Sequence, residues 1–273
     1  MTEPRPLDAE ALALFARKGR EGGAQVPQAG EANGVKVRRV MQLIADLAPR
    51  PFAELRILDL GCGEGVYAIE AGLRGAQVLA VDARTERMDE GAACARRHGL
   101  SNVRFVQGDV RNVSHGAFDV VLLLGLLYHL DAEDALALLD RVHAMCTGLL
   151  VVDTLVSLAP DAEVRGYRGE RVREHEDADP PETRRARLLR SIDNTFAFRF
   201  TRESLVRALG DAGFTSVLEC HAPLEPGKAG DRVTFAARRG EGVTIASYPW
   251  VNGASEEEIA RRIGSMQGGS GGA

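Results

Sequence analysis

The sequence contains little cysteine, little lysine and no long apolar segment, and these shortages exclude several classes of protein. Its four cysteines form no Cys-x-x-Cys pair, so a zinc knuckle or a dithiol redox motif has no support. The longest apolar run, residues 120–128, is far shorter than the ~20 residues that cross a bilayer. The first residues also lack the basic and apolar regions of a signal peptide. We therefore expect a soluble, cytoplasmic protein without membrane association.

Only three of the 34 basic residues are lysine, a skew that we attribute to coding bias, and the formal net charge is −5. Proteins that bind nucleic acid usually present a basic face, so nucleic acid is not an expected partner. The 45% hydrophobic and 27% charged residues are ordinary values for a globular chain. We expect a small-molecule substrate. The oligomeric state stays open, and the sequence is compatible with a dimer.

Short apolar segments alternate with helical patterns through most of the chain, which indicates βαβ units and a parallel sheet. Two consecutive strands near the end, with no helix between them, predict an antiparallel hairpin at one sheet edge. The expected fold class is thus α/β, a doubly wound and mostly parallel sheet. Strands are predicted at 56–60, 77–81, 103–107, 118–124, 149–154, 195–200, 216–221 and 232–238. Helices are predicted at 8–20, 35–47, 66–73, 86–98, 134–146 and 202–212, the last capped by Thr201.

The remaining segments predict a division of the chain. Residues 1–50 are expected to form a helical N-terminal cap, in which 24–34 resemble a loop, and residues 51–240 the core. Residues 157–193 interrupt the core with many acids and arginines, including Arg165, Arg168, Arg171 and Arg173. Two interpretations stay open for this insertion, a solvated surface loop and a lid over a substrate. Residues 241–273 are expected to form an extension with a flexible tail.

The strongest motif is a strand that runs into the glycine-rich turn of residues 59–65, Asp-Leu-Gly-Cys-Gly-Glu-Gly. Glycines let a backbone turn tightly and let a ligand approach closely, and the next helix offers free N–H groups. A dinucleotide site needs a third glycine at position 66, where this chain has Val66. Asp82 closes the second strand and is placed to accept the ribose hydroxyls of an adenosine. Gly108, Asp109 and Val110 end the third strand, again at this edge.

The fourth strand leads into Gly125-Leu-Leu-Tyr-His-Leu130. Together, the four motifs resemble class I methyltransferases that use S-adenosylmethionine. This resemblance implies a seven-stranded Rossmann-like methyltransferase fold, with S-adenosylmethionine as cofactor and S-adenosylhomocysteine as product. It implies cofactor binding by Asp59, Gly61, Cys62, Gly63, Gly65, Asp82, Ala83, Gly108, Asp109, Val110, Leu124, Gly125 and Tyr128.

A narrower resemblance, over residues 55–220, is to the tRNA wobble-uridine carboxymethyltransferase group and its small-molecule-methylating relatives. In that group the tyrosine matching Tyr128 contacts the carboxylate-bearing carbon of the cofactor. Two departures weigh against the tRNA activity: Leu130 replaces the group's arginine, and only about 50 residues stand where the group has its large N-terminal RNA-binding portion. A Tyr-x-Gly lid motif of some relatives is similar to residues 167–174.

Methyl transfer is an in-line displacement, so a base helps only when the acceptor carries a proton of high pKa. His129 is the leading candidate for that base, because its unperturbed pKa lies near neutrality. Tyr128 and the lid groups Glu170, Glu174 and His175 are further catalytic candidates. No metal site is expected. Substrate binding is expected from Tyr167, Arg168, Asp153 and Asn194.

Three functions follow from these patterns: metal-independent O- or N-methylation of a small molecule, with specialised metabolism as one setting; modification of the tRNA wobble uridine; and cofactor binding without catalysis. Salt-sensitive RNA binding would favour the second function.

Overall fold

The computed structural model describes residues 6–14, 29–114, 116–187, 189–221, 230–241 and 255–267. Contacts divide the chain into two compact units, residues 1–240 and 241–273. The predicted helix at 8–20 is helical over residues 9–14, and residues 15–20, like the GGSGGA tail, lie outside the described residues. None of the described helices is long and apolar enough to cross a membrane.

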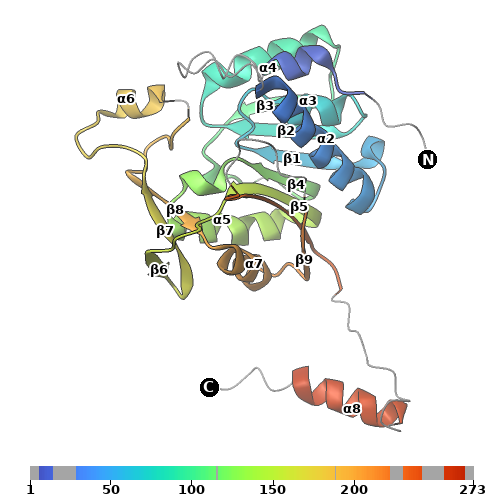
Figure 1. Ribbon diagram of the computed structural model, residues 1–273. Helices are drawn as coiled ribbons and strands as arrows, with labels where there is room; N and C mark the ends of the chain where they lie inside the picture. The colour runs from blue at the N-terminus through green and yellow to red at the C-terminus, as the bar shows by residue number, and fades with distance from the viewer. Residues whose placement is uncertain are drawn as a thin grey trace. The chain divides into compact units, whose positions relative to one another are not determined.

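A seven-stranded sheet forms the centre of the first unit (Figure 1) and confirms the predicted fold class. Its strand order is β3-β2-β1-β4-β5-β10-β9. The first five strands in this order are parallel, whereas β10 runs antiparallel to both of its neighbours, which confirms the edge hairpin. The strands are β1 (Arg56–Leu60), β2 (Gln77–Asp82), β3 (Val103–Gln107), β4 (Phe118–Leu124), β5 (Cys146–Leu155), β9 (Ser216–Glu219) and β10 (Arg232–Arg238).

Helices cover both faces of this sheet, as the apolar pattern of β4 requires. Val121 and Leu123 belong to one core cluster and Val120 and Leu122 to the other, so β4 is buried on both faces. The first cluster includes residues of α5 (Ala132–Met145) and α7 (Arg202–Asp211), and the second includes residues of α2 (Ala29–Leu47), α3 (Val66–Gly72) and α4 (Thr85–Arg97). As predicted, Thr201 caps α7 by accepting a hydrogen bond from the N–H of Ser204.

The structure corrects two sequence-based expectations. Residues 29–34, expected in a loop, form the first turns of α2. The solvated loop, one of the two interpretations of 157–193, is also wrong for the parts of that segment that form β6 (Ala162–Val164), β7 (Tyr167–Arg173) and α6 (Pro181–Ala186). These two strands form a second, antiparallel sheet with β8 (Phe196–Phe200). In the second unit, α8 (Glu256–Gln267) was not predicted.

The second sheet is joined to the main sheet at the predicted site. The N–H of Phe198 donates to the carbonyl of Leu130 at 2.8 Å. Leu130 directly follows η3 (Leu127–His129), a single 3₁₀ turn after β4. The backbone after β4 is therefore held between the two sheets, which fixes where Tyr128 and His129 lie.

Candidate active site

The carboxyl ends of β1, β2 and β4 meet at a cavity of about 330 Å³. Ligands in doubly wound sheets bind at this edge, because loops from neighbouring parallel strands converge there. Several residues that the sequence predicts for the cofactor line it, namely Gly61, Asp82, Ala83, Asp109, Val110, Gly125 and Tyr128, and so does His129, the predicted base. The sequence motifs, which are spread along the chain, are thus brought together.

The glycine-rich turn adopts backbone conformations that other residues rarely take. Gly61, Gly63 and Gly65 have φ angles of 71°, 55° and 73°. A Cβ atom on Gly65 would lie 2.3 Å from the ring of Phe105, so that position has no room for a side chain. Gly63 and Gly65 with Cys62 lie behind the cavity wall and shape it, rather than lining it.

Asp82 is a buried carboxylate held by the backbone on both sides. The N–H of Gly63 donates to its Oδ2 and the N–H of Arg84 to its Oδ1, each at 2.9 Å. This pair of hydrogen bonds fixes the carboxylate at the cavity edge, where its remaining lone pairs can accept from two hydroxyl groups.

Asp59 lies beneath the turn and is 1% exposed. Its Oδ2 has no hydrogen-bond partner among the described residues. Burial, reinforced by the nearby charge of Asp82, raises the pKa of Asp59 to about 7. Such an oxygen is free to accept a hydrogen bond or to face a cation.

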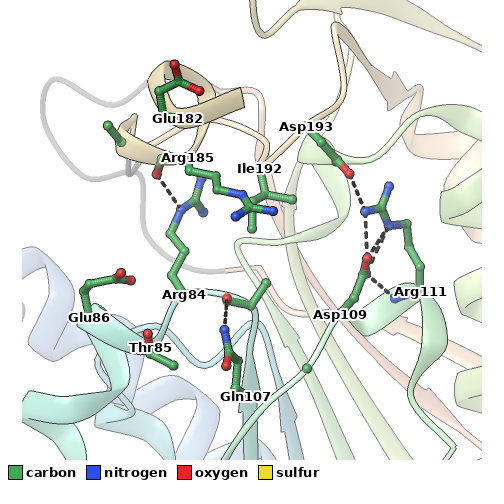
Figure 2. Close-up of a pocket in the computed structure, with 13 residues that line it drawn as sticks. Arg84, Thr85, Glu86, Gln107, Asp109, Arg111, Glu182, Arg185, Ile192 and Asp193 are labelled. Carbon is green, nitrogen blue, oxygen red and sulfur yellow. Dashed lines mark hydrogen bonds and ion pairs between the residues drawn. The ribbon is translucent and has the colours of Figure 1, made fainter. Parts of the chain in front are cut away.

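Ion pairs lie at both ends of the site. At one end, Asp109 accepts from Arg111, which also pairs with Asp193 at 2.6 Å (Figure 2). Beyond it a wider cavity of about 790 Å³ opens, lined in part by Gly108. At the other end Arg232 and Lys36 both approach Asp153, with Lys36 at 3.8 Å.

His129 pairs with a carboxylate from the second sheet. Its Nδ1 lies 3.1 Å from Oε1 of Glu174, which is buried. Oε2 of Glu174 accepts from the N–H of Ser191 at 2.8 Å. Burial by itself raises the pKa of Glu174, but the hydrogen bonds from His129 and Ser191 outweigh it and leave that pKa below its ordinary value. Glu174 therefore stays ionised and orients the imidazole.

Tyr128 lies between His129 and a basic residue that the sequence analysis missed. Its ring centroid is 4.3 Å from that of His129, and the guanidinium of Arg232 lies 5.7 Å from its centroid. Asp153, expected to bind substrate, is instead buried and ion-paired with Arg232. Asn194 donates to the carbonyl of His129 at 3.4 Å and so supports the backbone of this turn.

The other predicted site residues lie outside the cavity. Tyr167 donates to Asp211 on α7 at 2.7 Å, and the backbone N–H of Arg168 donates to Ser204 on the same helix. Glu170 and Leu124 are not among the residues that line it. His175 is buried, with Nε2 2.7 Å from the carbonyl of Ser191. The structure thus brings Glu174, but not its neighbours along β7, to His129.

Arg84 connects the core to the inserted segment of residues 157–193. The sequence analysis did not predict this role. The guanidinium of Arg84 donates to the carbonyls of Arg185, Arg187, Arg190 and Ser191 at 3.0–3.3 Å (Figure 2 shows the first of these carbonyls). Residues 189–193 of that segment line the cavity. One arginine therefore holds the wall of the site in place, directly after the Asp82 strand end.

We expect Arg84→Ala to loosen this wall. Backbone amides of residues 189–193 should exchange with solvent roughly tenfold faster, because charge-assisted hydrogen bonds of about 1.5 kcal/mol are lost. Hydrogen-exchange mass spectrometry measures this effect, with Arg104→Ala, on the exposed side of β3, as the matched control. Unchanged exchange in Arg84→Ala would show that the segment is held by its other contacts.

Comparisons with known proteins agree with this geometry. A ubiquinone biosynthesis O-methyltransferase from Methylocella silvestris is 31% identical over 141 residues, which cover 46% of this chain and 55% of that protein. The chain therefore spans only about half the length of this curated relative.

Two solved structures share the fold. The N-terminal domain of EvdMO1, crystallised with SAH and D-fucose, superposes with a TM-score of 0.59 at 24% identity, covering 75% of this chain and 82% of that domain. The 1,6-didemethyltoxoflavin-N1-methyltransferase of Burkholderia thailandensis gives 0.58 at 24% identity, covering 87% and 93%.

The glycine-rich turn, Asp82 and the Tyr128–His129 turn all fall within residues 33–219, which match the family described as Methyltransferase domain. That match spans more than half of the chain, and this protein therefore belongs to the methyltransferase-domain family.

Proposed function

We propose that this chain is an S-adenosylmethionine-dependent methyltransferase that methylates a hydroxyl group of a small molecule. The observation that carries the proposal is the pairing of His129, which lines the cavity, with Glu174 behind it. A hydroxyl holds its proton tightly and needs a base during transfer, whereas a neutral amine can attack through its lone pair. The O-methyltransferase named among the relatives supports the same choice.

Residues at the cavity and close to it fit the cofactor. Asp82 is anchored to accept the two ribose hydroxyls, and Asp109 lies at the end suited to the adenine amino group. The unpaired oxygen of Asp59 is an acceptor in need of a donor or cation, such as an ammonium group. Arg232 and Lys36 supply positive charge for a carboxylate near Tyr128 and Gly125.

When bound, the cofactor supplies a methyl group on a positively charged sulfur. His129 pairs with Glu174 through Nδ1, so Nε2 is the nitrogen free to take the hydroxyl proton as the new O–CH₃ bond forms and the S–CH₃ bond breaks. Glu174 stabilises the imidazolium that results. Tyr128 packs against the imidazole and limits its rotation. The inserted segment encloses the acceptor and excludes water.

Matched acceptor pairs test this function. Purified protein is given methyl-labelled cofactor with a phenol and the corresponding aniline, or a sugar and the corresponding aminosugar. We expect the label in methyl ethers. Label found only in amines would overturn O-methylation, and label found only in tRNA would support the wobble-uridine alternative. Cofactor binding without any transfer would support the non-catalytic alternative.

Asp59 predicts a proton release that accompanies cofactor binding. Its pKa of about 7 means that about half of the molecules carry this proton at pH 7. The positive charge of the cofactor favours the ionised form, so binding should expel the proton. Calorimetry at pH 7 in buffers of different ionisation enthalpy measures the release.

Two controls distinguish Asp59 from other groups. At pH 9 Asp59 is already ionised, so its release should vanish, and Asp59→Asn should lack it at pH 7. An equal release in wild type and Asp59→Asn would assign the proton to another residue.

A further inference from the structure

Three side chains with metal-binding atoms, those of Glu10, Cys94 and His98, meet at the C-terminal end of α4. Cys94 lies on α4 and His98 directly follows it; the N–H of His98 still donates to the carbonyl of Cys94, so the two residues lie on one face. Asp8 and Glu10 come from the N-terminal segment, which lies beside α4 (Figure 1). Ligand atoms of Glu10, Cys94 and His98 all lie within 4.8 Å of one another.

The surroundings of His98 are those of a metal ligand rather than of a hydrogen-bonded histidine. Its Nε2 lies 3.2 Å from Oδ1 of Asp8 and 3.3 Å from Oε2 of Glu10. This nitrogen is nevertheless buried and has no hydrogen-bond partner among the described residues. Around a tetrahedral zinc ion, with bonds of about 2.0–2.2 Å, neighbouring N and O ligands are about 3.3–3.5 Å apart. The observed separations match that spacing.

Neighbouring groups orient the two carboxylates. Arg97 contacts Oε1 of Glu10, which leaves Oε2 directed toward His98. Oδ1 of Asp8 accepts from the N–H of Ala11 at 2.9 Å, so the start of the N-terminal helix holds it in place. Such contacts around metal ligands fix their orientation and raise affinity.

Cys94 completes the set. Its side chain is fully buried, and cysteine sulfur is a common zinc ligand. A set of one sulfur, one imidazole nitrogen and one carboxylate oxygen suits zinc better than calcium or magnesium, which prefer oxygen alone.

We propose that Glu10, Cys94 and His98 bind a zinc ion that fastens the N-terminal segment to α4. Three of the four tetrahedral positions are filled by these side chains, and Asp8 lies next to His98. The site is separate from the cavity, and none of its residues lines that cavity. Its metal stabilises the fold and takes no part in methyl transfer.

Cobalt substitution of the full chain tests this site. The protein is stripped with a chelator, dialysed and titrated with Co²⁺, then with Zn²⁺. We expect one equivalent of Co²⁺, a thiolate-to-cobalt charge-transfer band in the near ultraviolet, and displacement by Zn²⁺. His98→Gln should weaken Zn²⁺ binding at least tenfold, in line with the loss of one ligand. Cys94→Ser should remove the charge-transfer band.

The chain offers a matched control in the adjacent pair Cys220 and His221. Cys220→Ser and His221→Gln should leave the band, the stoichiometry and the affinity unchanged. Because Cys94 is buried, His98→Gln serves as the decisive variant if Cys94→Ser fails to fold. Absence of a charge-transfer band, or binding that is equal in wild type and His98→Gln, would mean an adventitious ion only. His98 would then be an ion-paired histidine between two carboxylates.

Discussion

Replacing His129 by alanine is expected to lower kcat roughly 10²–10⁴-fold, the usual contribution of a general base. The dissociation constant of the cofactor should change little, because Asp82, Asp109 and the glycine-rich turn remain. Initial rates with a hydroxyl acceptor, combined with calorimetric titration of S-adenosylhomocysteine, separate the two quantities.

Glu174, which pairs with His129, provides a second variant for this test. Glu174→Gln keeps the size of the side chain and removes its charge, so we expect a smaller fall in kcat with an unchanged affinity for the cofactor. Glu170→Gln, four residues earlier on β7, should leave kcat unchanged. Wild-type turnover in His129→Ala would show that His129 is not the base. The rate enhancement would then come from the alignment of the acceptor with the methyl group.

Replacing Asp82 by alanine is expected to weaken cofactor binding about 10²–10⁴-fold. The carboxylate offers two charge-assisted hydrogen bonds of about 1.5–3 kcal/mol each, and every 1.4 kcal/mol corresponds to about a tenfold change in the dissociation constant. Loss of Asp82 also leaves the N–H groups of Gly63 and Arg84 without their acceptor. Titration of S-adenosylhomocysteine measures the effect directly.

Asp140→Ala is the matched control, since Asp140 is an exposed acid on α5. Its cofactor affinity should equal that of the wild type. Near-ultraviolet circular dichroism shows whether Asp82→Ala remains folded. Tight binding by a folded Asp82→Ala would contradict the assignment of Asp82 to the ribose.

Local patterns were sufficient to predict most of the main sheet. Alternating apolar strands and helices indicated its five parallel strands, and the missing helix before the last strand indicated the antiparallel edge. Glycines in the turn after β1 and acids at the ends of β2 and β3 located the cofactor cavity, because parallel strands place their carboxyl ends at one edge. Residues 157–193 were harder to predict, since their many charges mask the weak alternation of β6 and β7.

The sequence by itself thus determined the sheet, its edge hairpin and the acids that line the cavity, because these depend on contacts repeated along short segments. Only the tertiary structure decided which residue of segment 157–193 pairs with His129. Glu174 lies 45 residues away along the chain and directly follows β7, the strand that holds Glu170. The hydrogen bond from Arg84 to the carbonyl of Ser191, 107 residues later in the chain, was likewise decided by the tertiary structure. Such pairings depend on how two sheets pack together, and no local pattern carries that information.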